Sequence, residues 1–248
     1  MLIFSMPRSG SSAFAEKLAL ENELVNNKEF FNVKVSGFHP YLGTYMIEGL
    51  NKINITGETI KIDSIDLSNK LPKDYKERIK ILENSPLDID EYVVKILPHH
   101  VSWISKEIID LFKNTHTYIL NRRDTLRQFL SWYFANTTKR FHNRVSFGEG
   151  FRSHRALTEA YNNQFPDGVI ITEEWFERFS GLFQKYIYGS LVIKNFFNKI
   201  EMINYEDIYY PDNLGNKKID IDYNDWVNNL DEVKAFTNQI NTYKEKII

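Results

Sequence analysis

The chain has 248 residues, 42% of them hydrophobic and 15% aromatic, which is enough to build the core of an ordinary globular protein. Its formal net charge of −2 argues against a general nucleic-acid binder, and the absence of cysteine excludes a disulfide framework and a thiolate metal site. The sequence contains no apolar run long enough to span a membrane and no recognisable signal peptide, so we expect a soluble cytoplasmic protein.

The first predicted elements are a strand, a tight loop and a helix. Residues 2–5 are apolar enough for a strand that is buried on both faces, as strands of parallel sheets are. The sequence Pro-Arg-Ser-Gly-Ser-Ser follows at residues 7–12 and is called loop 7–12 below. A helix over residues 11–19 places Phe14 and Leu18 one turn apart on its inner face.

The next part of the chain is less regular. Residues 30–35 are a weak strand candidate, and Pro40 opens a predicted helix that runs to about Leu50. Residues 53–90 show little periodicity, apart from a charged helix that is predicted at 73–84.

Two strand-and-helix pairs come next. Residues 92–97 form a predicted strand that a proline ends, and helical spacing follows over 101–112. Residues 116–120 form the next strand, and Asp124 can cap a helix that begins at Thr125.

The last part of the chain is predicted to be mainly helical. Residues 139–155 are basic and show little periodicity, so we expect a mobile loop there. A long helix is predicted from Glu173 to about Asn198, followed by a short strand at 201–205 and by helices over 222–246. The buried side of the long helix is expected to carry Trp175, Phe176, Phe179, Phe183, Ile187 and Leu191.

Strands that alternate with helices predict a single α/β domain over residues 1–248. We expect three layers, in which helices flank a central parallel sheet on both faces. Ligands of such folds bind at the carboxyl ends of the strands, which is where loop 7–12 is predicted to lie.

Loop 7–12 has the composition of an anion-binding site. The first amide groups of a helix have no partner within the helix, and the helix dipole adds positive potential there. Arg8 adds a charged fork of donors that suits phosphate or sulfate oxygens. The loop lacks the G-x-x-x-x-G-K-[ST] sequence of a nucleoside-triphosphate P-loop. An ordinary serine-capped turn is the alternative interpretation.

A second basic turn is predicted where the strand at 116–120 gives way to a helix. Arg123 lies at the strand end, and Ser131 lies eight positions later, about two helical turns on. Arg127 falls on the same helix face, one turn before Ser131. A solvated basic turn ahead of a core helix is the alternative. Two turns that each carry arginine and serine favour a ligand with phosphates at both ends.

Together these segments resemble the sulfotransferases that use 3′-phosphoadenosine 5′-phosphosulfate (PAPS). The first loop of that family, often PKSGTT or PRSGST, is similar to loop 7–12. The family's second motif, an arginine and a serine eight apart, corresponds to Arg123 and Ser131. Residues 203–208, Ile-Asn-Tyr-Glu-Asp-Ile, resemble its strand-end YEDL element. The resemblance covers the nucleotide site and not the acceptor site, and it implies the P-loop-NTPase-like sulfotransferase fold.

The resemblance implies a role for each matching residue. Arg8 stands where many members have a catalytic lysine, and it would act electrostatically because arginine is a poor proton donor. Arg123 and Ser131 would bind the 3′-phosphate, and Tyr205 would lie near the adenine. The residues that would bind the 5′-phosphosulfate are Arg8, Ser9, Gly10, Ser11 and Ser12.

The base that deprotonates the acceptor has several candidates. Cytosolic members use a histidine at a KTH-type strand end, where this chain has Lys95 but Leu97 in place of the histidine. His99 or His100 could substitute from the following loop. Some bacterial carbohydrate sulfotransferases instead use a glutamate before an aromatic pair, and Glu29 in Lys-Glu-Phe-Phe matches that pattern. Glu29 is therefore the first candidate, with a plain surface carboxylate as the alternative.

The remaining basic residues are assigned less specifically. His39 is a further candidate for the base, although a loop histidine is more often structural or solvated. Residues 139–155 could contact the 3′-phosphate or an anionic acceptor, or form a solvated loop. Arg152 and Arg155 could replace the Arg-Lys-Gly segment of cytosolic members. No spacing of ligand residues predicts a metal site, so we expect a metal-independent protein.

The predicted activity is transfer of a sulfuryl group from PAPS to a hydroxyl or amine of a small-molecule or carbohydrate acceptor, with release of 3′-phosphoadenosine 5′-phosphate (PAP). A small-molecule kinase with a degenerate phosphate loop is one alternative, and a non-catalytic PAP- or PAPS-binding protein is another. We expect neither nucleic acid nor a membrane as a partner. Residues 36–90 and 139–168 are expected to shape the acceptor pocket.

Overall fold

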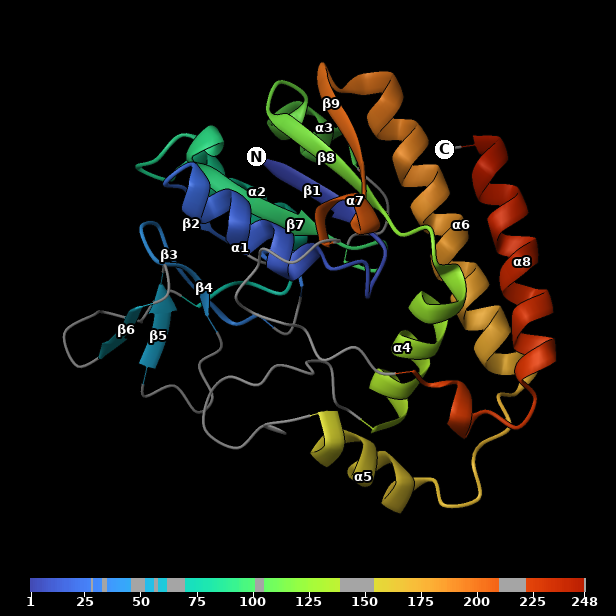
Figure 1. Cartoon of the computed structure of the whole chain (residues 1–248). Helices are drawn as coiled ribbons and strands as arrows, with labels where there is room; N and C mark the ends of the chain where they lie inside the picture. Colours follow the sequence, from blue (N-terminus) through green and yellow to red (C-terminus); the bar gives the residue numbers. More distant parts are fainter. Residues whose placement is uncertain are drawn as a thin grey trace. The chain divides into compact units, whose positions relative to one another are not determined.

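The structure of the protein is a computed structural model, shown in Figure 1. It describes residues 1–27, 29–32, 35–45, 52–55, 58–61, 70–100, 105–138, 154–209 and 222–247. Backbone contacts divide the chain into two compact units. Unit 1 comprises Met1–Asn121 and Leu182–Ile203, and unit 2 comprises Arg122–Gly181 and Asn204–Ile248. The expectation of a single domain over residues 1–248 stays a prediction.

Unit 1 is built on a five-stranded sheet with the strand order β2-β7-β1-β8-β9. Each of the first three neighbouring pairs in this order is parallel. The predicted α/β class, with a central parallel sheet flanked by helices, is confirmed. The strands are β1 (Leu2–Ser5), β2 (Val25–Asn26), β7 (Tyr92–Ile96), β8 (His116–Asn121) and β9 (Lys199–Asn204).

The two faces of this sheet are covered by different helices. Lys95 of β7 and Tyr118 of β8 pair with the same residue of β1, so both side chains point to one face. On that face Tyr118 meets Phe14 of α1 (Ser11–Glu21) edge to face. Phe4 points to the opposite face and stacks on Tyr186 of α6 (Glu173–Phe196), with ring centroids 5.5 Å apart.

Among the other described residues of unit 1 are short hairpins and the helices α2 and α3. Strands β3 (Gly37–His39) and β4 (Gly43–Tyr45) pair antiparallel, as do β5 (Lys52–Ile55) and β6 (Glu58–Lys61). The charged helix predicted at 73–84 corresponds to α2 (Tyr75–Glu83), which Asp74 caps by accepting a hydrogen bond from the Lys76 amide at 2.7 Å. A 3₁₀ turn, η2 (Ile89–Glu91), leads into β7, and α3 (Lys106–Phe112) follows in the region where helical spacing was expected.

The predicted strand at 30–35 is wrong where the structure describes it. Residues 29–31 form a turn, and the short edge strand lies earlier, at β2. The physical reason is that backbone carbonyl groups of Phe30, Asn32 and Val35 accept hydrogen bonds from Arg78 instead of from a neighbouring strand.

The helix expected to begin at Pro40 is also replaced by a turn. The Leu42 amide donates to the His39 carbonyl at 3.2 Å and closes the turn between β3 and β4. Gly43 then leads into β4 with a φ of 75°, a left-handed conformation that glycine adopts without strain. Residues 46–50 of the expected helix lie outside the described residues.

Unit 2 is helical and is held together by aromatic side chains. Phe129 of α4 contacts Phe176, Phe179 and Phe236, and Phe134 forms a second such group with Tyr161, Tyr223 and Trp226. Both groups bury large ring surfaces, which stabilises the packing of these helices. The elements are α4 (Thr125–Thr138), α5 (His154–Gln164), the first part of α6, α7 (Tyr205–Tyr209), η3 (Asn224–Trp226) and α8 (Leu230–Ile247).

Some boundaries and one helix face differ from expectation. Leu191 of α6 is 39% exposed, because the buried stripe of the second half of this helix runs instead through Tyr186, Ser190 and Ile193. The last strand ends at Asn204, so that Tyr205 begins α7 instead of closing the strand. Residues 154–155, expected in the basic loop, belong to α5, and residues 139–153 lie outside the described residues.

Candidate functional site

Loop 7–12 connects the carboxyl end of β1 to α1, as predicted. Gly10 is the N-cap of α1 with a φ of 78°, and Arg8 has a φ of 65°. Two left-handed residues this close together turn the chain sharply, and the arginine conformation is uncommon for a residue with a Cβ atom. The Ser9 hydroxyl is buried and donates to the Met6 carbonyl at 2.7 Å, so Ser9 offers its amide rather than its hydroxyl to a ligand.

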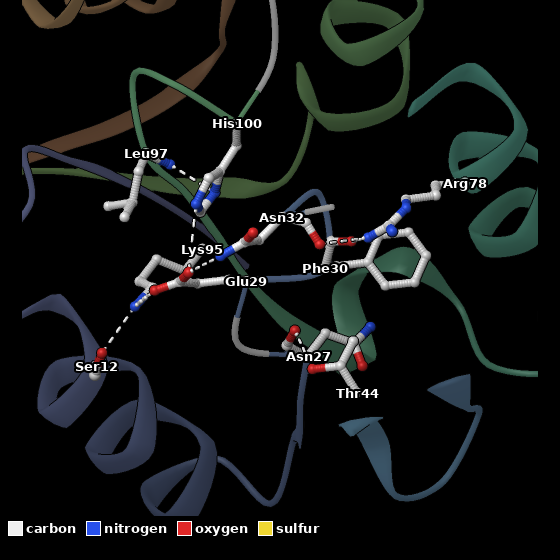
Figure 2. Close-up of polar contacts among 10 residues, drawn as sticks. All are labelled: Ser12, Asn27, Glu29, Phe30, Asn32, Thr44, Arg78, Lys95, Leu97 and His100. Atoms are coloured by element: carbon white, nitrogen blue, oxygen red, sulfur yellow. Dashed lines mark hydrogen bonds and ion pairs between the residues drawn. The ribbon is translucent and has the colours of Figure 1, made fainter. Parts of the chain in front are cut away.

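A polar cluster lies beside this loop and brings together Ser12, Glu29, Lys95 and His100, as Figure 2 shows. Lys95 Nζ donates to Ser12 Oγ at 2.7 Å and lies 2.7 Å from Glu29 Oε1. The lysine side chain is only 4% exposed, whereas that of Glu29 is 27% exposed. We call these residues the Glu29 cluster. Three of them, Ser12, Glu29 and His100, are residues that the sequence singled out.

His100 completes the cluster from the loop after β7. Its Nδ1 atom accepts a hydrogen bond from the Leu97 amide at 3.2 Å, which places the ring next to the position where a histidine was expected. Its Nε2 atom lies 3.3 Å from Glu29 Oε2 but does not meet the geometry of a hydrogen bond. Asn32 Nδ2 donates to the same carboxylate oxygen at 2.6 Å. The Glu29 carboxylate is therefore approached from three sides.

These contacts set the protonation states in the cluster. Burial alone would raise the pKa of the Glu29 carboxyl, but the proximity of His100 and the charge of Lys95 outweigh burial and hold this pKa well below its usual range. Burial lowers the pKa of His100, so its imidazole is neutral at pH 7. Since Nδ1 accepts from the Leu97 amide, the proton of the neutral ring belongs on Nε2, facing Glu29.

The other two histidine candidates, His99 and His39, make ring contacts. His99 is exposed, and its ring packs edge to face on that of His100. His39 ends β3, where its Nδ1 atom accepts from the Tyr41 amide at 3.3 Å and its ring contacts that of Tyr41. Glu29 pairs with Lys95, and His100 Nε2 lies 3.3 Å from the Glu29 carboxylate, so the structure brings these two candidates together.

The second predicted turn belongs to unit 2. Asp124 Oδ1 accepts from the Arg127 amide at 2.8 Å, which confirms the predicted cap of α4. The Arg123 side chain is 59% exposed and pairs with Asp207, 2.7 Å from Nη2 to Oδ1. Glu206 accepts hydrogen bonds from the amides of Arg123 and Asp124. Ser131 is buried in α4.

Tyr205 lies beside this turn in unit 2. The guanidinium carbon of Arg122 is 4.8 Å from the centre of the Tyr205 ring, a cation–π distance. Lys244 of α8 donates to the Arg122 carbonyl and, at 3.2 Å, to the Thr125 hydroxyl. The C-terminal helix thus fixes the turn that carries Arg123, a role that sequence reasoning did not identify.

Two residues that contact Glu29 were not proposed as site residues, namely Lys95 of the Glu29 cluster and Asn32. The sequence carried a signal for the first, because a lysine inside the apolar strand Tyr-Val-Val-Lys-Ile requires a buried partner of opposite charge. No comparable signal existed for Asn32, whose contact depends on the turn at 29–31.

Metal sites and membrane spans can be assessed over the described residues. In the described ranges, no three histidine, aspartate or glutamate side chains gather where they could hold a metal ion. Over the same ranges, no helix combines the length and apolar character needed to cross a membrane.

Comparison of the chain with models of protein families, with curated proteins and with solved structures found no match in any of the three.

Proposed function

We propose that the protein transfers a sulfuryl group from PAPS to a hydroxyl or amine of an acceptor and releases PAP. The proposal rests on the resemblance of loop 7–12 and of the Arg123 to Ser131 spacing to PAPS-dependent sulfotransferases. The single structural observation that carries it is the Glu29 cluster, in which Lys95 joins Ser12 at the start of α1 to the candidate base Glu29.

Each group has a defined part in the proposed reaction. Glu29 takes the proton of the acceptor hydroxyl, and the freed oxygen lone pair forms a new bond to sulfur. The bond between sulfur and the bridging oxygen breaks, and its electron pair stays on the 5′-phosphate of PAP. Arg8 and the amides of loop 7–12 stabilise the negative charge that develops on these oxygens. The charge of Arg8 is permanent, so it does not supply a proton.

The low pKa of Glu29 has to be reconciled with a role as base. A carboxylate held by Lys95 is a weak proton acceptor, because a catalytic pKa works best near the operating pH. Lys95 already reaches Ser12 of the loop, so a dianionic phosphosulfate there competes with Glu29 for the ammonium group. Binding of the donor would then free Glu29 and raise its pKa, since burial remains.

Calorimetry with PAP and with ATP, each with and without Mg²⁺, tests the nucleotide. The proposal predicts PAP binding that is insensitive to Mg²⁺ and tighter than ATP binding. A preference for ATP with Mg²⁺ would contradict it and favour the kinase. Transfer of radioactive sulfate from labelled PAPS to methyl glucoside, 2-naphthol and tyramine tests turnover with three acceptor classes. PAP binding without transfer to any of the three would favour a binding protein instead.

A further inference from the structure

Arg78 of α2 is a buried charged residue whose partners are backbone carbonyl groups. It is 1% exposed, and its guanidinium group donates to the backbone carbonyls of Pro72, Phe30, Asn32 and Val35 at 2.5 to 3.0 Å. Figure 2 shows it reaching the segment that follows Glu29. Three of the four acceptors lie in this segment, more than 40 residues earlier in the chain.

The contacts of Arg78 are unusual for a buried charge. Every acceptor that it reaches within the described residues is a backbone carbonyl, and none is a carboxylate. Burial lowers the pKa of its guanidinium group, but arginine stays charged at all ordinary pH values. Carbonyl dipoles therefore compensate the charge, and in turn the guanidinium group satisfies carbonyls that have no strand to pair with.

These carbonyls lie directly beside the candidate base. Phe30 follows Glu29 in the chain. Asn32 donates two hydrogen bonds to Glu29, from its backbone amide to the Glu29 carbonyl at 2.8 Å and from Nδ2 to the carboxylate at 2.6 Å. The rings of Phe30 and Phe31 are buried and meet edge to face. Glu29 thus belongs to a turn whose backbone carbonyls are hydrogen-bonded by the side chain of Arg78.

We propose that Arg78 is a positioning residue for Glu29, because its guanidinium group holds the carbonyls of Phe30, Asn32 and Val35 and thereby fixes the turn at residues 29–31. This turn holds the Glu29 carboxylate between Lys95 and His100. The effect on turnover rests on the proposed sulfuryl transfer. The effect on the carboxylate itself does not, so the two can be tested separately.

The kinetic test compares Arg78→Gln and Arg78→Lys with Ile79→Val, a neighbouring buried position of α2 that makes none of these carbonyl contacts. The acceptor is the most active of methyl glucoside, 2-naphthol and tyramine. Misplacing a catalytic group by about 1 Å costs on the order of 100-fold in rate, so kcat should fall by about that factor in Arg78→Gln. PAP affinity should stay within about twofold, since loop 7–12 is untouched. A kcat no lower than that of Ile79→Val would overturn the proposal.

Chemical rescue separates positioning from general stability. Arg78→Ala leaves a space that guanidinium can enter, so millimolar guanidinium chloride should restore part of kcat, and sodium chloride at the same ionic strength should not. Restoration by both salts, or by neither, would show that the lost activity is a stability effect. Arg78→Lys should be intermediate, because its three donors cannot span the same four carbonyls.

A readout without turnover decides the matter if the wild type transfers no sulfate. Carbon-13 NMR follows the side-chain carboxyl of Glu29, identified by its loss in Glu29→Gln. The wild-type signal should stay constant from about pH 7 to the ordinary glutamate value of 4.5, because the carboxyl stays ionised. In Arg78→Gln, or in Arg78→Lys if the former does not fold, the signal should move over this range. A constant signal in the folded variant would overturn the proposal whatever the activity.

Discussion

Lys95 Nζ lies 2.7 Å from Glu29 Oε1, and this ion pair joins β7 to the turn that follows β2. The lysine has almost no contact with solvent, so its charge depends on the carboxylate and on Ser12 for compensation. Lys95 therefore connects the candidate base to Ser12 at the end of loop 7–12.

Replacing Lys95 by methionine should raise the pKa of Glu29. The opposite charge is lost while burial, which favours the protonated carboxyl, remains. If Glu29 is the base, the acid limb of the kcat/KM profile should move to higher pH in Lys95→Met. Lys113→Met, which removes an exposed lysine paired with Asp110, is the control and should leave the profile unchanged. An acid limb at the wild-type position in Lys95→Met would argue that Glu29 does not control the rate.

His100 should make the protein less stable in mild acid. Burial holds the folded pKa below the ordinary value of 6.5, so the unfolded chain binds the proton more readily. The contribution of neutral His100 to the free energy of unfolding is therefore fully present above pH 6.5. This contribution is lost as the pH falls below that value. Urea unfolding at pH 7.5 and 5.5 should show a larger loss for the wild type than for His100→Gln. Equal losses would indicate that the histidine titrates normally.

Lys244 should make the protein more stable in mild alkali. Its folded pKa is lowered to about 8 from 10.5, chiefly by burial, so the unfolded chain binds more protons between these values. Stability should rise with pH in this window by up to about 3 kcal/mol, at about 1.4 kcal/mol per pKa unit. Urea unfolding should show this rise in the wild type and not in Lys244→Met. Lys234→Met changes an exposed lysine of the same helix and should keep the rise.

Arg123→Ala should weaken PAP binding with little effect on stability. The pair with Asp207 is exposed on both sides, and such pairs contribute at most about 1 kcal/mol. A charged hydrogen bond to phosphate contributes about 1.5–3 kcal/mol, which corresponds to about 10- to 100-fold in affinity. Calorimetry with PAP measures the loss, and Arg178→Ala, another exposed arginine of unit 2, is the control. Unchanged PAP affinity in Arg123→Ala would show that Arg123 does not bind the nucleotide.

The fold could be predicted where the pattern of apolar residues is strong. Residues 2–5 and 92–97 are continuous apolar runs, and the structure has buried parallel strands at both. Asp124 could be recognised as a helix cap because an N-cap depends only on its immediate neighbours. The turn at 29–31 could not be predicted, because Arg78, which holds it, is distant in sequence.

The candidate site was predictable residue by residue but not as a cluster. Ser12, Glu29 and His100 were each proposed from local motifs, and the structure brings them together through Lys95. The sequence indicates that Lys95 needs a partner of opposite charge, but it does not identify Glu29 as that partner, because the contact is set by the register of β7 against β1. The roles of Arg123, Ser131 and Tyr205 stay predictions, since they depend on a ligand.

The most direct test of the proposed function is sulfate transfer from labelled PAPS by Glu29→Gln beside the wild type, with PAP affinity measured on both. The wild type should transfer sulfate to at least one of the three acceptors. The variant should lose at least about 100-fold in kcat, within the range typical of a general base, while its PAP affinity stays nearly the same. Full activity in Glu29→Gln would contradict the assigned role, and absence of PAP binding by the wild type would contradict the account as a whole.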